Sequence, residues 1–301
     1  MTTVTPTAAE PDILCLDLVR IFAVQGIEVQ ALQGLNLRVE RGELVALIGA
    51  SGSGKSTLLS ILSGLDSPTA GSAVVAGSDL PSMTPRQRVD YQRRSVGFVW
   101  QQTSRNLLPY LSAGENVALA MAVAGTGSRA SRSGELLDLL GVAEQRDRRP
   151  AELSGGQQQR VAIAVALANS PRVLLADEPT GELDEATSIE VLEAMERVNS
   201  ELGVTTLIVT HDPTVSDHVK RTVQIRDGRT STEVLRSTHT DEHGEEHHMA
   251  EEFAVLDRVG RLQLPTDFVT SLALKDRVRL NLESDHIGVW PNTPVRKDDS
   301  E

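Results

Sequence analysis

The sequence feature that most constrains the fold is a glycine-rich stretch, Gly49-Ala50-Ser51-Gly52-Ser53-Gly54-Lys55-Ser56. The apolar run before it, residues 44–48, is typical of a buried parallel strand, and residues 57–62 after it have helical character. A strand, a glycine loop and a helix in this order form a phosphate-binding loop. The glycines let backbone N–H groups turn inward, and the helix N-terminus adds partial positive charge. The alternative is a glycine-rich turn that matches by chance.

The loop carries the side chains that a nucleotide requires. Lys55 is expected to hold the β and γ phosphates, and Ser56 is expected to ligate Mg²⁺. The nucleotide-binding positions predicted for this loop are Gly49, Ser51, Gly52, Ser53, Gly54, Lys55, Ser56 and Thr57.

The composition indicates a soluble globular protein, with 40% hydrophobic and 24% charged residues. Its 301 residues predict about two domains, one of them small. The single cysteine, Cys15, excludes an intrachain disulfide and fits a reducing compartment. Residues 1–12 are expected to be a disordered tail and not a signal peptide, which favours a cytoplasmic chain. The net charge of −13 argues against general nucleic-acid binding.

No apolar stretch approaches the length that crosses a bilayer, about 20 residues. The longest, such as residues 117–124, are far shorter, so a membrane role requires a partner protein. Residues 13–39 are expected to form an edge sheet, because apolar residues nearly alternate there. Helical signals dominate residues 113–152, which predicts a helical insertion between sheet elements.

Polar side chains follow three further apolar runs, at the edge where parallel sheets place their ligands. Gln101 follows residues 95–100, and its amide can ligate a metal and orient a water. Asp177 and Glu178 end the run that starts at residue 173, so Asp177 is suited to Mg²⁺ and Glu178 to general-base catalysis. The alternatives are a solvated glutamine and an acidic pair on the surface.

His211 follows the run 205–210 and reaches the same edge. A lone histidine is usually structural, but one in this position can contact a γ-phosphate and hold a water and Glu178 in register. Phe22 is an aromatic residue on which an adenine ring can stack, and a packing role fits it equally well.

Leu153-Ser154-Gly155-Gly156-Gln157 opens a helix and suits a second anion. One chain does not need two phosphate sites, unless the second serves the nucleotide of another subunit. The sequence therefore predicts a dimer in which Ser154, Gly155, Gly156 and Gln157 contact the partner's nucleotide.

With these motifs in one order, the chain from about Ile13 to Leu235 closely resembles the ATP-binding subunits of ABC transporters. The resemblance implies an α/β fold of the P-loop NTPase kind, with a parallel core sheet, an N-terminal antiparallel β subdomain and a helical subdomain. The expected ATP-binding domain spans residues 13–232, with its helical part at about 102–168. ATP and Mg²⁺ are the implied cofactors, and ATP hydrolysis is the implied reaction.

The resemblance also implies roles for individual residues. Lys55, Glu178, His211 and Gln101 match catalytic positions, while Ser56, Gln101 and Asp177 match the metal shell. Phe22 matches the adenine-stacking aromatic, and Asp184, in the Leu183-Asp184 loop, belongs to the nucleotide-binding set. In this family two subunits, identical or paralogous, close head to tail around two ATP molecules, and each signature serine caps the opposite γ-phosphate.

Residues 179–184, 209–213 and 224–229 look most like the branch that works lipoprotein-release and macrolide-efflux permeases. This implies a separate membrane-spanning permease and a place on the cytoplasmic face of the cell membrane. Three positions depart from the pattern, namely Glu182, Val165 and residues 103–105, and the last lies where the family meets its permease. The rival hypothesis is a soluble ABC ATPase, or a regulator that binds DNA through the C-terminal part.

Residues 233–252 are acidic and rich in histidine, which predicts a solvated linker. Its histidines can also bind a transition metal; they are His239, His243, His247 and His248. Residues 253–290 have short strand patterns and resemble the AbrB-like swapped-hairpin module, which implies dimerisation, and residues 291–301 are expected to be a tail. Residues 253–301 carry seven basic and eight acidic side chains, too little positive charge for DNA.

Overall fold

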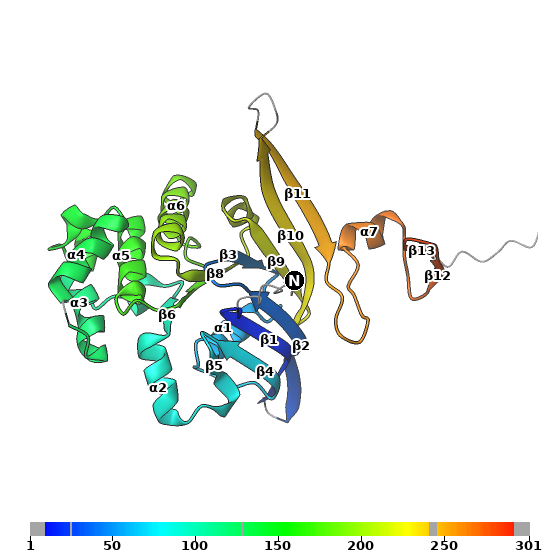
Figure 1. Ribbon diagram of the computed structural model, residues 1–301, viewed down its shortest axis with the longest axis horizontal. Helices are drawn as coiled ribbons and strands as arrows, with labels where there is room; N and C mark the ends of the chain where they lie inside the picture. The colour runs from blue at the N-terminus through cyan, green and yellow to red at the C-terminus, as the bar shows by residue number, and fades with distance from the viewer. Residues whose placement is uncertain (1–9, 25, 128, 241–245, 292–301) are drawn as a thin grey trace, which may run out of the picture.

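The computed structural model describes residues 10–24, 26–127, 129–240 and 246–291. Its centre is a seven-stranded sheet with the order β11-β10-β9-β3-β8-β7-β6 (Figure 1). Five of these strands are parallel, and the antiparallel strands β10 and β11 lie at one edge. The strand bounds are β3 Leu44–Ile48, β6 Val96–Val99, β7 Val173–Asp177, β8 Thr205–Thr210, β9 Arg221–Arg226, β10 Arg229–Thr240 and β11 Glu246–Ala254.

The parallel strands are buried on both faces, which is why the sequence shows them as continuous apolar runs. Alternate residues of one strand belong to different cores: Leu174 and Ala176 of β7 face one side, and Val173 and Leu175 face the other. On the first side the core includes side chains of α3, α5 and α6, and on the second side those of α1. The helices are α1 Lys55–Leu62, α2 Pro85–Arg94, α3 Ala113–Ala124, α4 Arg129–Leu139, α5 Gly155–Leu167 and α6 Glu185–Leu202.

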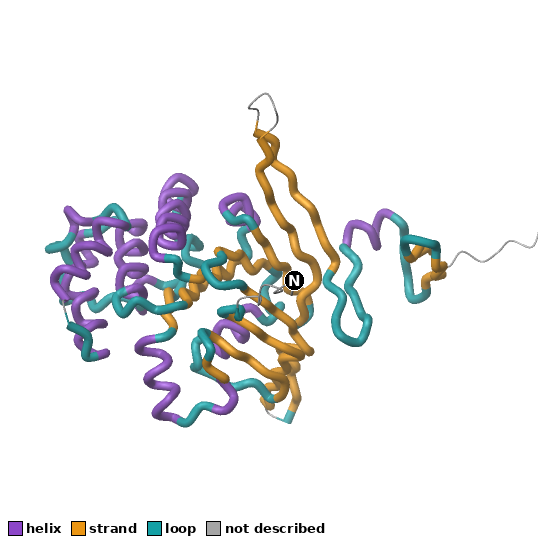
Figure 2. Tube along the Cα trace, in the orientation of Figure 1, coloured by secondary structure: helices purple, strands orange, loops and turns teal. Residues whose placement is uncertain are grey.

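A second, antiparallel sheet covers α1 from the other side, with the order β2-β1-β4-β5. Its strands are β1 Ile13–Val24, β2 Ile27–Val39, β4 Ala70–Val75 and β5 Ser78–Asp79. Helices α3, α4 and α5 gather at one end of the molecule, at the left of Figure 2. Short 3₁₀ turns complete the connections at Leu80–Ser82, Thr103–Arg105, Ala143–Gln145, Pro150–Glu152 and Pro213–His218. The predicted α/β architecture is confirmed, with its antiparallel sheet and its helical insertion.

The expected tail of residues 1–12 is wrong at its last residue. Asp12 is buried, with 1% of its surface exposed, because its carboxylate accepts hydrogen bonds from Arg172 and, at 2.6 Å, from the Thr205 hydroxyl. This ties the start of β1 to β7 and β8. Residues 1–9 lie outside the described residues.

The expected linker of residues 233–252 is also wrong where it is described. Strands β10 and β11 pair there in register, from Thr232 opposite Ala254 to Thr240 opposite Glu246. Strand β9 accompanies β10 only as far as Leu235, so the rest is a two-stranded ribbon that projects from the sheet (Figure 1). His243 and the side chains of the other three histidines lie outside the described part.

The residues after β11 form α7 Thr266–Ser271 and a hairpin of β12 Val278–Leu282 and β13 Ile287–Pro291. The strands expected near residues 255–264 are absent from this described stretch, which is a loop. No described residue from 255 to 291 is buried. Pro291 closes β13, and the rest of the expected tail, residues 292–301, lies outside the described residues.

Candidate active site

The phosphate-binding loop connects β3 to α1, and its glycines are required where the backbone is crowded. A Cβ atom on Gly49 would lie 2.5 Å from the carbonyl oxygen of Ile225. Gly54, which caps α1, has a φ of 104°, a conformation that side chains with a Cβ disfavour. The loop therefore keeps a tight curve around the start of α1.

Lys55 closes this curve from inside. Its Nζ donates hydrogen bonds to the carbonyl oxygens of Gly49 at 2.6 Å and Ala50 at 3.0 Å, and only 7% of the residue is exposed. Burial lowers the pKa of Lys55, while the charges of Glu178 and Asp177 act in the opposite direction. The charged ammonium group is thus held among backbone groups. An anionic phosphate bound there would offset the free-energy cost of burying this charge.

A cavity of about 530 Å³ opens over this loop and gathers predicted residues from three strand ends. Its lining is Ala31, Ser51, Gly52, Gly54, Lys55, Ser56, Thr57, Glu178 and His211. Beneath it, the Oγ of Ser53 is buried without a hydrogen-bond partner among the described residues. A buried hydroxyl donor and a lysine in a glycine loop fit the phosphates of a nucleotide.

Glu178 and His211, the predicted general base and its partner, are hydrogen-bonded to each other in the cavity. His211 Nδ1 lies 2.8 Å from Glu178 Oε1, a hydrogen bond that the imidazole donates when Nδ1 carries its proton. Glu178 has a φ of 46°, unusual for a residue with a long side chain, and its backbone N–H donates to Val209 O at 2.7 Å. This bond to β8 holds Glu178 in a strained conformation that is typical of functional sites.

The predicted metal ligands meet in a neighbouring cavity of about 320 Å³ that Ser56, Gln101 and Asp177 line together. Ser56 lines both cavities and joins them. Burial and the nearby charge of Glu178 raise the pKa of Asp177, and Lys55 opposes this shift. A carboxylate, an amide and a hydroxyl offer the hard oxygen ligands that Mg²⁺ prefers, so these residues fit that ion.

Phe22 does not line the cavity. It lies in β1, half-buried, with the guanidinium of Arg20 4.4 Å from the centre of its ring. Ala31 of β2 forms the cavity wall instead. The adenine-stacking role of Phe22 stays a prediction.

The signature residues lie apart from the phosphate loop of their own chain. Ser154 caps α5: its Oγ accepts from Gln157 N at 3.3 Å, and Gln157 Oε1 accepts from Ser154 N at 3.0 Å. Ser154 and Gly155 are exposed, and neither they nor Gly156 and Gln157 are among the residues that line the cavity.

Asp184 similarly caps α6, where its carboxylate accepts from Thr187 N at 3.0 Å and from the Thr187 hydroxyl at 2.8 Å. These bonds lower the pKa of Asp184. The side chain is exposed and does not line the cavity at the phosphate loop, so its predicted place in the nucleotide-binding set stays a prediction.

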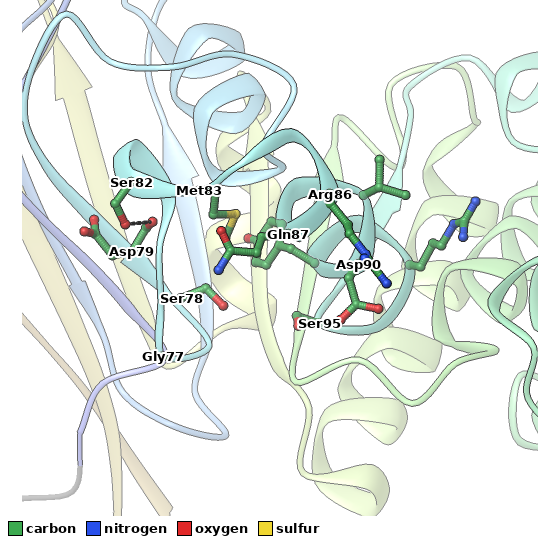
Figure 3. A pocket seen from close by; sticks show the side chains of 12 residues that line it. Gly77, Ser78, Asp79, Ser82, Met83, Arg86, Gln87, Asp90 and Ser95 are labelled. Atoms are coloured by element: carbon green, nitrogen blue, oxygen red, sulfur yellow. Dashed lines mark hydrogen bonds between the residues drawn. The ribbon is translucent and has the colours of Figure 1, made fainter.

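A larger cavity, about 950 Å³, lies elsewhere among the described residues, between the β5 region and α2 (Figure 3). Asp79, Arg86 and Asp90 line it with other polar groups, but none of the predicted catalytic residues does. The smaller cavity at the phosphate loop is therefore the candidate active site, since Lys55, Glu178 and His211 line it together.

Comparison with known proteins agrees with this geometry. The family model described as ABC transporter matches residues 32–181. A Thermotoga maritima protein described as an uncharacterized ABC transporter ATP-binding protein is 47% identical over 216 residues, which are 71% of this chain and 91% of that protein. The chain belongs to the ABC transporter family. As a cassette of this family it is an ATPase.

Two further relatives have more specific names. The lipoprotein-releasing system ATP-binding protein LolD of Geobacter metallireducens is 46% identical over 71% of this chain and 95% of its own length. The macrolide export ATP-binding/permease protein MacB of Syntrophobacter fumaroxidans is 49% identical over 70% of this chain. The chain spans only 30% of the length of that MacB.

Solved structures give the same fold. A dimeric ATP-binding cassette in a post-hydrolysis state with ADP and Pi has a TM-score of 0.66 and 36% identity, covering 73% of this chain and 97% of that chain. A second dimeric bacterial cassette has a TM-score of 0.67 with the same coverage. The family model ends at residue 181, so it lends no support to the AbrB-like resemblance of residues 253–290. Within the described residues, no helix has the length and apolar character needed to span a membrane.

Sequence reasoning missed two contributors to the site, Ala31 and Gly228. Gly228 donates its N–H to Ser53 O at 3.0 Å and so supports the phosphate loop from below. The Asp227-Gly228 pair is a hairpin signal that was visible in the sequence, but its contact with the loop is not local.

Proposed function

We propose that this chain hydrolyses ATP at two sites shared with a second copy of itself, or with a paralogue. ATP binding closes this dimer, and the closing motion is transmitted to a separate membrane permease. The observation that carries the proposal is the separation of two phosphate-binding elements in one chain. The cavity holds Lys55, Glu178 and His211, while Ser154 faces solvent on another element. The dimeric state of two similar solved cassettes supports the same arrangement.

In this proposal Lys55 and the N–H groups of the loop hold the phosphates, and Ser56, Asp177 and Gln101 hold Mg²⁺. The ion would neutralise negative charge that develops on the transferred phosphoryl group. Glu178 accepts a proton from the attacking water as the new bond to phosphorus forms and the bond to ADP breaks. His211, whose Nδ1 lies 2.8 Å from Glu178 Oε1, keeps that carboxylate oriented, and when the ring carries both protons its Nε2 donates toward the γ-phosphate.

The permease is proposed to be of the lipoprotein-release or macrolide-efflux type, because the relatives LolD and MacB carry these names. Its docking place is proposed beside Gln101. Leu65, with 56% of its surface exposed, lines a cavity there of about 280 Å³ together with Phe98 and Trp100. The guanidinium of Arg105 lies 5.7 Å from the centre of the Trp100 ring. A chain docked in this way lies on the cytoplasmic face of the membrane.

The test is the variant Glu178→Gln, which keeps the shape of the side chain but removes its basicity. We expect ATP binding to persist and turnover to fall by about 100- to 10,000-fold, the usual contribution of a general base. Steady-state phosphate release and nucleotide titration measure the two effects. Glu182→Gln is the matched control, because Glu182 is an exposed glutamate in the same loop and lines neither cavity. Wild-type hydrolysis by Glu178→Gln would refute the assigned role.

The permease partner is tested separately. We expect the chain to co-purify from detergent-solubilised membranes with a multi-span protein, and to lose it when Leu65 is changed to Glu. Recovery of the chain without any membrane protein, under conditions where ATP hydrolysis is intact, would contradict the transport role and leave the ATPase assignment standing.

A further inference from the structure

Arginines of the cassette contact the last described part of the chain, residues 255–291. We call it the C-terminal segment. Arg226, the final residue of β9, donates from Nη1 to the Thr266 hydroxyl at 2.9 Å and from Nη2 to Leu264 O at 3.1 Å. Arg229, the first residue of β10, has its Nη1 3.8 Å from the Asp257 carboxylate. Two arginines that flank one tight turn therefore hold the start of the segment.

Apolar packing adds little to this attachment. No described residue of the C-terminal segment is buried. A cavity of about 350 Å³ separates residues 255–263 from β2 and the start of β10. The Oε1 of Gln263 is buried at this boundary without a partner among the described residues. A backbone bond from Val255 N to Ser231 O at 2.9 Å holds the segment where it leaves β11, and the arginine contacts hold residues 257–266, so removing one of them should loosen that stretch.

The turn between the two arginines is Asp227-Gly228, and it supports the phosphate loop. Its φ angles are 52° and 68°, as in the type I′ turns that join twisted antiparallel strands. Gly228 N donates to Ser53 O at 3.0 Å, and Gly228 O accepts from Gln33 N at 2.9 Å. The turn is thus bonded both to the phosphate loop and to β2.

The space around this turn is filled. A Cβ atom on Gly54 of the phosphate loop, or one on Gly228, would lie 2.6 Å from the carbonyl oxygen of Ala31. Ala31 is itself a wall of the nucleotide cavity. Backbone atoms of the turn, the loop and the cavity wall are therefore in contact, so a displacement of the turn moves the other two.

We propose that Arg226 is a positioning residue for the nucleotide site. By holding residues 264–266 of the C-terminal segment against the end of β9, it fixes the Asp227-Gly228 turn and thereby the phosphate loop and Ala31. ATP affinity consequently depends on how the C-terminal segment is seated. This inference rests on the nucleotide site of the proposed function and adds a residue that does not line the cavity.

The proposal specifies which kinetic parameter changes. The turn touches the part of the site that binds phosphates, whereas Glu178 and His211 are carried by the ends of β7 and β8. Loss of Arg226 should therefore raise the KM for ATP and leave kcat at saturating ATP within about twofold. A hydrogen bond is worth about 0.5–1.5 kcal/mol net, which corresponds to an increase in KM of about 2- to 10-fold.

The experiment compares four single variants and one double variant of the full chain. Arg226→Ala should raise KM by the stated factor, and Arg226→Lys should restore part of the affinity because an ammonium still reaches one acceptor. Thr266→Val removes the acceptor from the other side; it should raise KM less, since Leu264 O remains, and it should add nothing in the double variant with Arg226→Ala. Arg258→Ala is the control, because Arg258 joins the segment to Asp17 and not to the turn.

Thermal unfolding of each variant separates a local effect from loss of folding. An unchanged KM in Arg226→Ala, or equal increases in Arg226→Ala and Arg258→Ala, would overturn the inference while ATP binding by the wild type stands. Failure of the wild-type chain to bind ATP would instead refute the proposed function. A parallel fall in kcat and in thermal stability without a change in KM would assign Arg226 a purely structural role.

Discussion

At the scale of single residues, the account depends on charges that are buried before any ligand arrives. Burial and Glu178 raise the pKa of Asp177 above its ordinary value of 3.8. Between these two pKa values the folded chain binds more protons than the unfolded chain, so stability falls as pH rises through that window. Above the raised pKa, burial of the ionised carboxylate lowers the free energy of unfolding by its full amount. Below pH 3.8 the carboxyl group is protonated in both states and this loss of stability is absent.

Asp177→Asn should therefore be more stable than the wild type at pH 7 without Mg²⁺, and the difference should shrink as the pH falls toward 4. Urea unfolding at a series of pH values measures this. Added Mg²⁺ with nucleotide should stabilise only the wild type, since the amide is a poorer ligand than the carboxylate. If the variant were less stable than the wild type at pH 7, interactions in the nucleotide-free chain would already offset the cost of burying the Asp177 charge.

The candidate catalytic side chains could be located from the sequence because residue type and position after a buried strand both point to the same edge of the sheet. Lys55, Asp177, Glu178 and His211 are examples, and all four lie around the joined cavities. Ala31 and Gly228 contribute through backbone atoms and close approach, which no side-chain pattern signals. Phe22 has the chemistry for stacking, but the structure places its ring against Arg20 and not in the cavity.

At the scale of elements, the N-terminal turn of the signature helix α5 packs closely against the first turn of α6. A Cβ atom on Gly156 would lie 2.2 Å from Cγ2 of Thr187, a residue that also binds the capping Asp184. Gly156→Ala should therefore destabilise the fold by about 1–3 kcal/mol, the usual cost of overpacking. Denaturant unfolding measures the loss.

Thr187→Ser is the matched rescue for Gly156→Ala. Serine lacks the Cγ2 methyl but keeps the hydroxyl that donates to Asp184 at 2.8 Å. The double variant should recover most of the lost stability. Equal destabilisation with and without Thr187→Ser would place the cost elsewhere in the helix.

Elements were predictable where burial forces a pattern. The parallel strands β3, β7 and β8 are buried on both faces and read as apolar runs. The ribbon of β10 and β11 was missed because it extends beyond the end of β9 and has no core to face. Its strands are paired by backbone hydrogen bonds, which acidic and polar residues form as well as apolar ones, so no apolar pattern marks it. Asp12 was missed because its partners, Arg172 and Thr205, are far away in sequence.

At the scale of the whole molecule, the predicted nucleotide-binding residues of one chain fall into two groups, which we propose to be halves of two different sites. The phosphate loop, Glu178 and His211 share one cavity, whereas Ser154 and Asp184 cap exposed helix starts. In the proposed dimer, a head-to-tail pair of chains would bring each Ser154 to the partner's phosphate loop and produce two equal sites. Each chain alone then carries all the residues but no complete site.

The most direct test of this arrangement mixes two inactive variants, Lys55→Ala and Ser154→Arg. A dimer of one chain of each kind has one site with an intact Lys55 and an intact Ser154, and one site with neither. With equal amounts and free exchange, half the dimers are mixed, so hydrolysis should recover to about a quarter of the wild-type rate. If each chain carried a complete site of its own, the mixture of the two folded variants would stay as inactive as its components.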